Sequence, residues 1–200
     1  MIVAMTRRPS LLVGGVLVAY VTTAVTIAAT EGFVVDGGPP WPIIVGFALP
    51  IVGFLGLLRS RSVRDYLLGF DPRLVVAVQL WRVIGAAFLF GWVVDDLAPG
   101  FAIPAGLGDV VTGVAALALL SRIHAGTLAR RDVVLFSMLG VGDFAVALAA
   151  GGLVRPEGLA TLPWVLFPVL AAPIFAMVHV LNWIQLTALP SGRPAGPGRG

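Results

Sequence analysis

Six apolar stretches, each about twenty residues long, follow one another along the chain, and short polar or Gly/Pro-rich breaks separate them. A helix needs roughly 20 apolar residues to cross the ~30 Å hydrocarbon core of a bilayer. Lipid offers no hydrogen bonds to the backbone, so such stretches fold as helices. The sequence therefore predicts an all-α, polytopic membrane helix bundle over residues 1–189. Its six transmembrane helices are expected at residues 10–30, 40–58, 74–94, 101–121, 132–153 and 162–186.

The composition argues against a soluble domain. Apolar residues make up 58% of the 200 residues and charged residues only 12%, whereas soluble domains carry about 25% charged residues. Cysteine is absent, which excludes disulfides, thiolate metal sites and cysteine nucleophiles. The chain also lacks an Asp-rich diphosphate motif and a phosphate-binding Gly loop with Lys, so neither a cofactor nor a metal is predicted.

The arginines predict the orientation. Eleven of the thirteen lie before the first span, between spans two and three, between spans four and five, or after span six. The positive-inside rule places these loops in the cytoplasm. Because the arginines follow the membrane topology, no nucleic-acid partner is expected. The prediction is a multi-pass protein of the bacterial inner membrane with both termini cytoplasmic and a disordered tail over residues 190–200.

Ionisable residues inside the predicted spans are the main functional signal, because a charge at the bilayer centre costs about 2.5–3.5 kcal/mol. Arg82, Asp109 and Asp143 lie about nine to twelve residues into their spans, near the midplane at a rise of 1.5 Å per residue. Isolated charges are unfavourable in hydrocarbon, so the arginine is expected to lie between the two aspartates. The predicted ligand-binding residues are Gln79, Arg82, Asp109, Asp143, His179 and Asn182. A purely structural role, in which the ion pairs fix helix register, is the alternative.

A Gly-x-Gly-Asp pattern occurs twice, at 106–109 and at 140–143. Small residues follow each copy at helical spacing, which predicts that spans four and five pack through glycine faces and bring Asp109 and Asp143 together. The pattern resembles the motif of presenilin-type and prepilin intramembrane aspartyl proteases. That resemblance implies that Asp109 and Asp143 are candidate catalytic residues. It covers four residues at each site and lacks the Pro-Ala-Leu sequence of presenilins.

Across spans three to six, the chain is similar to a set of small uncharacterised bacterial six-span membrane proteins. The residues that carry this resemblance are Gln79 and Arg82, the stretch 101–109 (Phe-Ala-Ile-Pro-Ala-Gly-Leu-Gly-Asp), the Gly-x-Gly-Asp of span five, and Pro173 with His179. The resemblance implies the same six-span fold, and it supplies no activity.

Three functional hypotheses follow. The first is a midplane polar pocket for proton-linked binding or transport of a small or lipid-like ligand, whose polar group would bind at Arg82. Prolines at 163, 168 and 173 would kink the last span, as in transporters. The second is an enzyme that acts on a lipid or isoprenoid by Asp acid–base chemistry. The third is an accessory subunit of a homodimer or larger membrane complex, in which the polar cluster only specifies packing.

Overall fold

A computed structural model of the chain describes residues 2–35 and 39–188, and within them every regular element is helical. This confirms the predicted all-α class; the predicted disordered tail lies outside the described residues. The elements are α1 (Ile2–Ala29), α2 (Trp41–Leu57), α3 (Arg61–Leu68), α4 (Pro72–Val78), η1 (Gln79–Gly85), α5 (Ala86–Val93), α6 (Pro99–His124), α7 (Arg130–Val154), η2 (Glu157–Ala160), η3 (Phe167–Ala171) and α8 (Ala172–Ala188).

Five of the helical segments that the structure describes are long and apolar enough to cross a membrane: Pro9–Ala29, Pro72–Val93, Pro99–His124, Arg130–Val154 and Phe167–Thr187. The second runs through α4, η1 and α5. The number rises to six if α2 and α3, which bend by 103° at their junction, count as one broken span. Such a set of helices is typical of a multi-pass membrane protein.

The distribution of exposed residues is the reverse of that in a soluble protein. Large apolar side chains cover the outside, with Leu11 73% exposed and Leu153 85% exposed, whereas Gln79, Arg82 and Asn182 are fully buried. Exposed apolar side chains are stable in lipid, and polar groups there must turn inward. The pattern fits a bundle surrounded by hydrocarbon.

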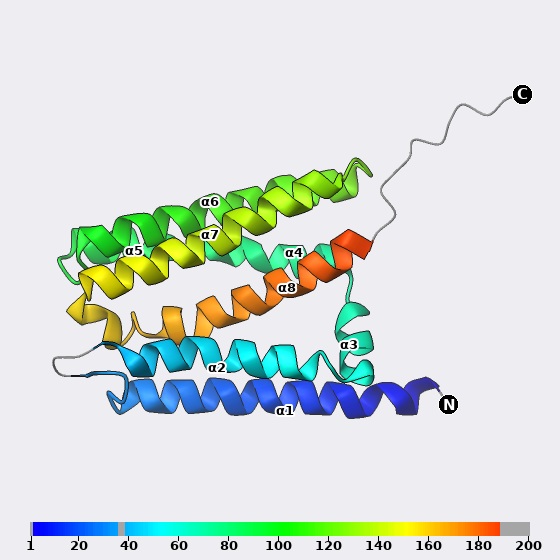
Figure 1. The fold of residues 1–200 in the computed structure, drawn as a ribbon, viewed down its shortest axis with the longest axis horizontal. Helices are drawn as coiled ribbons and strands as arrows, with labels where there is room; N and C mark the ends of the chain where they lie inside the picture. The colour runs from blue at the N-terminus through cyan, green and yellow to red at the C-terminus, as the bar shows by residue number, and fades with distance from the viewer. Residues whose placement is uncertain (1, 36–38, 189–200) are drawn as a thin grey trace, which may run out of the picture.

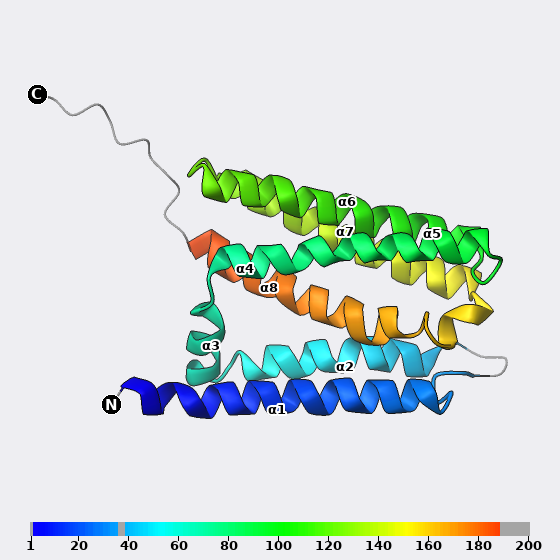
Figure 2. The same cartoon turned by 180° about the vertical axis from the view of Figure 1, so that it is seen from behind.

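The helices run roughly antiparallel (Figures 1 and 2). α1 and α2 lie along one side of the bundle, α6 lies along the other, and α8 crosses between them. α1 begins and α8 ends at the same end of the bundle, where α3 stands across the other helices. We call this end, which carries Arg59, Arg61, Arg73, Arg122, Arg130 and Arg131, the arginine end. The opposite end carries Asp95, Asp96 and Arg155.

α3 was not expected from the sequence, which places a loop between the second and third predicted spans. Its Val63 and Leu67 are buried and its arginines are exposed, so it is an amphipathic helix. Its 8 residues are too few to resemble a span. Gln185 of α8 donates hydrogen bonds from Nε2 to the carbonyls of Leu68 and Phe70, at 3.2 and 3.0 Å. These bonds satisfy carbonyl groups that follow the end of a helix.

The start of the last span is broken by its prolines. η3 is a single π-helical turn that includes Pro168, and Pro173 follows it. Because Pro173 has no N–H group, the Val169 carbonyl has no helical donor four residues on; it accepts instead from the Tyr20 hydroxyl of α1. α2 contacts both η3 and α8, whereas α4 and α7 contact α8. The backbone of the last span therefore lies closer to α7 toward the arginine end, and toward the other end Phe167 of η3 reaches Phe88 of α5 at a ring-centroid distance of 4.5 Å.

Candidate functional site: an arginine between two aspartates beside an apolar cavity

Arg82 forms the centre of the candidate site, and each of its three guanidinium nitrogens bonds a different residue. Nε donates to Asp109 Oδ1 at 2.8 Å, Nη2 donates to Asp143, and Nη1 lies 3.2 Å from His179 Nε2. The Arg82 side chain is fully buried, and the side chains of Asp109 and Asp143 are 16% and 5% exposed. The predicted position of Arg82 between the two aspartates is therefore confirmed. We call these four residues the ion cluster.

The 3₁₀ geometry of η1 explains why Arg82 points inward. A 3₁₀ helix has three residues per turn, so every third side chain lies on the same face. Gln79, Arg82 and Gly85 follow that spacing, and all three are buried. The polar side chains therefore form a single inward row. Gln79 Nε2 donates to the Phe175 carbonyl of α8 at 3.1 Å, which ties η1 to the last span.

Aromatic rings and a neutral histidine complete the environment of the guanidinium. The Arg82 Cζ atom lies 4.2 Å from the centre of the Phe144 ring, a cation–π distance. Arginine can only donate hydrogen bonds, so His179 Nε2 must accept from it. The proton of the neutral imidazole then lies on Nδ1. His179 Nδ1 has no partner among the described residues.

Two glycines make room for the aspartates. A Cβ atom added at Gly85 would overlap the Asp109 side chain, and one added at Gly108 would overlap the Asp143 carboxylate. Each aspartate thus lies directly against the backbone of a neighbouring helix. Such close approach requires glycine, because any side chain would occupy the carboxylate's position.

The two Gly-x-Gly-Asp copies are not equivalent. A Cβ atom at Gly140 would overlap the imidazole of His179, whereas one at Gly142 would meet no atom within 4 Å. In the first copy Gly108 faces Asp143, and a Cβ atom at Gly106 would lie 3.1 Å from the Gly85 carbonyl. The repeated motif therefore serves three different contacts, one to each of three neighbouring helical segments.

The predicted packing of α6 on α7 through matching glycine faces is wrong in its details. The two helices do contact each other. However, a Cβ atom at Gly113 would lie 2.8 Å from Val83 Cγ1 and 3.1 Å from its backbone N. The face that carries Gly106, Asp109 and Gly113 therefore packs on η1 and α5. The reason is Arg82: Asp109 shares this face, and its ion pair turns the face toward η1.

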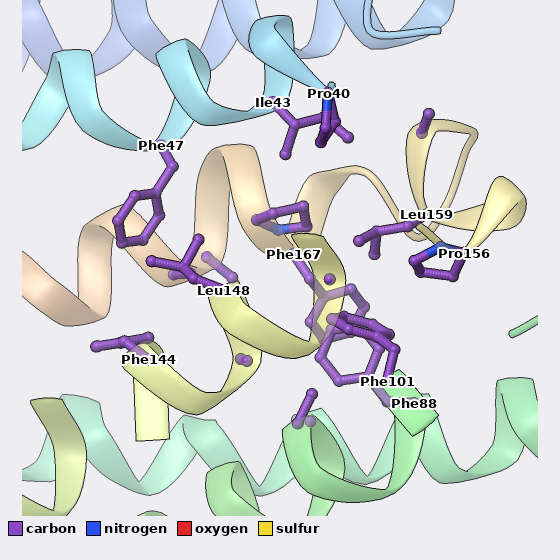
Figure 3. A pocket seen from close by; sticks show the side chains of 18 of the residues that line it. Pro40, Ile43, Phe47, Phe88, Phe101, Phe144, Leu148, Pro156, Leu159 and Phe167 are labelled. Carbon is purple, nitrogen blue, oxygen red and sulfur yellow. The ribbon is translucent and has the colours of Figure 1, made fainter. Parts of the chain in front are cut away.

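An apolar cavity of about 610 Å³ lies beside the ion cluster, on the side away from the arginine end. Figure 3 shows Pro40, which precedes α2, and Ile43 and Phe47 of α2 facing it from one side and Phe88 and Phe101 from the other. Further lining residues include Trp81, Ile84, Phe144, Ala147, Leu148, Leu159, Phe167 and Phe175. Its charged lining residues are Asp109, Asp143 and Arg155. The volume is typical of small-molecule sites, which span about 300–1,000 Å³.

The cavity places the predicted ligand-binding residues in two groups. Asp109 and Asp143 line it. Asp143 lies about 18 Å along α7 from Arg155, at a rise of about 1.5 Å per residue. Arg82 and His179 lie behind the two carboxylates and are not among its lining residues. The nitrogens of Arg82 bond protein partners, so a ligand in the cavity would meet the carboxylates first, and ligand binding at Arg82 stays a prediction. Ligand contact with the carboxylates stays a prediction.

Gln79 and Asn182 also lie outside the lining of the cavity. Both are fully buried. Gln79 Oε1 and both polar atoms of the Asn182 side chain have no hydrogen-bond partner among the described residues. Within residues 2–35 and 39–188, no group of three or more His, Asp or Glu side chains could hold a metal ion.

Several site residues were missed from the sequence. Phe144 follows Asp143 directly, and an aromatic neighbour of a buried charge could have been noted as a cation–π partner. Thr112 and Ser137 are buried, three residues from Asp109 and from Gly140 respectively; that helical spacing placed them on the same faces. The cavity aromatics carry no comparable signal, because phenylalanine is common throughout the spans.

Removing Arg82 should be strongly destabilising. Arg82→Met leaves two buried carboxylates without a cation, so we expect the free energy of unfolding in mixed micelles to fall by about 3–5 kcal/mol. The same change with Asp109→Asn and Asp143→Asn should recover most of that loss. Arg122→Met is the control: its partner is Asp132 and its side chain is 48% exposed, so a loss below about 1 kcal/mol is expected. Equal losses in the single and triple variants would contradict the pairing.

Gly108 and Gly142 provide a matched test of the close approach. Gly108→Ala places a methyl group on the Asp143 carboxylate, and we expect it to lower the free energy of unfolding by about 1–3 kcal/mol, as overpacking does. Gly142→Ala adds the same group where no atom lies within 4 Å, and it should change that free energy by less than about 1 kcal/mol. Similar effects of both variants on SDS-induced unfolding, followed by circular dichroism, would refute this geometry.

Comparisons with known proteins identify a family for this chain. No curated protein and no solved structure matches it. One family profile matches residues 43–187, a range that contains the ion cluster and most of the cavity lining and excludes α1. The profile covers well over half of the sequence, so the chain belongs to the family described as "Domain of unknown function (DUF8737)".

Proposed function

We propose that this protein binds an amphiphilic, lipid-like molecule in the cavity, with its polar group against Asp109 and Asp143. The observation that carries the proposal is the combination of a largely apolar wall with the two carboxylates of the ion cluster, which also line the cavity. Ligand sites typically combine an apolar lining with a few polar groups that fix orientation. The apolar part of the ligand would occupy the space between α2 and α5–α7 (Figure 3).

The carboxylates define the chemistry of the polar group. Ionised carboxylates only accept hydrogen bonds, and with Arg82 the two aspartates carry a net charge of −1 when both are ionised. A hydroxyl or amine group would therefore be favoured, and an anionic group would be repelled. Arg82 cannot offset this repulsion by direct contact, since Asp109, Asp143 and His179 occupy its nitrogens.

The same charge balance supports proton-linked binding or transport. One proton added to either aspartate makes the cluster of Arg82, Asp109, Asp143 and neutral His179 electrically neutral. An entering ammonium group has the same effect on the net charge. Proton and cationic ligand would then compete for the cluster, which is a simple form of coupling by linkage.

We further propose that α1, α2, the α4–η1–α5 segment, α6, α7 and the η3–α8 segment each cross a bacterial inner membrane. The arginine end would face the cytoplasm, with both termini there. The charge distribution supports this orientation: the arginine end holds the basic loops, and the opposite end holds Asp95, Asp96 and one arginine, Arg155.

The orientation can be tested with single cysteines, because the chain has none of its own. Thr127→Cys lies in the α6–α7 loop at the arginine end, and Thr161→Cys lies at the opposite end; both positions are exposed. A membrane-impermeant maleimide added to intact cells should label only Thr161→Cys. Lysed cells should label both, which controls for reactivity. Labelling of Thr127→Cys alone in intact cells would show that the orientation is opposite to the one proposed.

Filling the cavity should abolish binding. Ala147 lines the cavity, whereas Ala145, two residues earlier in α7, faces outward and is exposed. We expect C12 alkyl amine and alcohol probes to raise the melting temperature of the wild type and of Ala145→Phe, and to have no effect on Ala147→Phe. A carboxylate probe of the same chain length should raise it least, because the cavity presents carboxylates.

The pH dependence of binding tests the coupling. Affinity for the amine probe should fall as the pH is lowered in the wild type, because protons compete with the ammonium group for the cluster, and this change should be lost in Asp143→Asn. If the probes raise the melting temperatures of Ala147→Phe and Ala145→Phe equally, the cavity is not the binding site. Preference for the carboxylate probe would overturn the proposed chemistry of the polar group.

Acid–base catalysis on a lipid or isoprenoid is a second candidate, because both carboxylates line the same apolar cavity. Mass spectrometry of lipids extracted from the purified protein separates the two functions. An enzyme would leave a converted product in the wild type and the unconverted compound in Asp143→Asn. A binding or transport protein would carry the same compound in both.

A further inference from the structure

A second group of polar residues lies inside the bundle, apart from the cavity. Thr112 and Asn182 are fully buried, as is Gln79, and Ser137 is 9% exposed. We call Gln79, Thr112, Ser137 and Asn182 the polar layer. Five of its side-chain atoms have no hydrogen-bond partner among the described residues: Gln79 Oε1, Thr112 Oγ1, Ser137 Oγ, Asn182 Oδ1 and Asn182 Nδ2. His179 Nδ1, the protonated nitrogen, is a sixth atom without one.

The polar layer lies on the arginine side of the ion cluster. Thr112 follows Asp109 by three residues in α6, and Asn182 follows His179 by three in α8. Gln79 precedes Arg82 by three residues, and Ser137 precedes Asp143 by six. At about 1.5 Å per residue, the layer is roughly 5–9 Å closer to the arginine end than the cluster. α6 contacts η1 and α7, and α8 contacts α4 and α7, so the segments that carry these residues surround a common interior.

An apolar layer closes the bundle beyond these residues. It consists of Val76, Ala116, Leu119, Val133, Phe136 and Leu186, which pack together. Val76, Ala116, Val133 and Leu186 each lie three or four residues from a member of the polar layer, toward the arginine end. The polar layer is therefore bounded by the ion cluster on one side and by packed apolar side chains on the other. The cavity lies beyond the cluster, on its far side.

Unpartnered polar atoms at this depth are unfavourable, because burial removes their hydrogen bonds to bulk water. Buried polar groups in proteins that lack a protein partner usually bond internal water, which makes about three hydrogen bonds. These donors and acceptors belong to four helical segments, η1, α6, α7 and α8, and lie at a similar depth in the bundle. We infer that the polar layer binds a cluster of internal waters, and that these waters form a proton path between the ion cluster and the arginine end.

His179 anchors the waters beside the ion cluster. Its Nε2 accepts from Arg82 and its Nδ1–H is the free donor next to the polar layer. The charged groups that face it are Arg82 and, through Arg82, Asp109 and Asp143. Its uncharged neighbours include Gly140, Phe136 and Phe144. When the apolar layer opens, a proton would pass along the waters from bulk water to the carboxylate of Asp109 or Asp143, because Arg82 keeps its protons and cannot relay one from His179. This assigns the proton route to the side opposite the cavity and so rests on the proposed function, whereas the water site does not.

Radiolytic footprinting tests the water site. X-rays convert bound water to hydroxyl radicals, which oxidise side chains next to it, and the full-length protein in nanodiscs can be analysed by mass spectrometry. Phe136 packs against the His179 ring at a centroid distance of 5.0 Å and is only 4% exposed. We expect it to be oxidised in the wild type and several-fold less in Thr112→Val/Ser137→Ala. Phe33, also 4% exposed but in the contact between α1, α2 and η3, is the internal reference and should not change.

A dry polar layer would overturn the inference. Phe136 would then stay unmodified, or its oxidation would be the same in both proteins. The melting temperature gives a second readout: loss of a water-bonded hydroxyl lowers it, whereas removal of an unpartnered hydroxyl raises it. We expect Thr112→Val to lower it, with Thr22→Val, the same change at an exposed position of α1, as control. Thr112→Val/Ser137→Ala should still bind the alkyl probes, and Phe136 should still be oxidised in Ala147→Phe. The proposed cavity site and the proposed water site can therefore be refuted separately.

Discussion

The ion cluster of Arg82 is the interaction on which the arrangement of the bundle depends. Its three nitrogens bond residues from α6, α7 and α8, so one guanidinium links η1 to three other helices. A charge in this position is stable only when its partners are present, because burial without them costs several kcal/mol. The cluster therefore fixes which face of each helix turns inward. Gly85, Gly108 and Gly140 permit this by leaving room for the three partner side chains.

The ion cluster also divides the interior into two regions of opposite character. Toward one end lies the apolar cavity, with Asp109 and Asp143 on its wall. Toward the arginine end lie the polar layer and then the packed apolar layer. The course of the last span contributes to this asymmetry. α8 contacts α2, α4 and α7, whereas η3 contacts α1 and α2, so the last span packs more closely on α7 toward the arginine end.

The all-α class and the central role of Arg82, Asp109 and Asp143 could be predicted because charge in hydrocarbon is costly wherever it occurs. The contacts of the glycines could not. The two Gly-x-Gly-Asp copies look alike in sequence, yet Gly108 touches Asp143 and Gly142 touches nothing within 4 Å. Their difference depends on which neighbour each face meets. α3 was missed because eight residues with Arg61 and Arg64 do not resemble a span.

By itself, the sequence determined the helical class, the approximate positions of the apolar segments and the depth at which ionisable residues lie. Each of these follows from hydrophobicity and a rise of about 1.5 Å per residue, which are local properties of the chain. Only the tertiary structure decided that the carboxylates, and not Arg82, line the cavity, and that Gln79 and Asn182 belong to a separate polar layer. Depth along a helix is one coordinate. The direction of a side chain around that helix depends on the packing of all the others, here set by the 3₁₀ turn of η1 and the broken start of the last span.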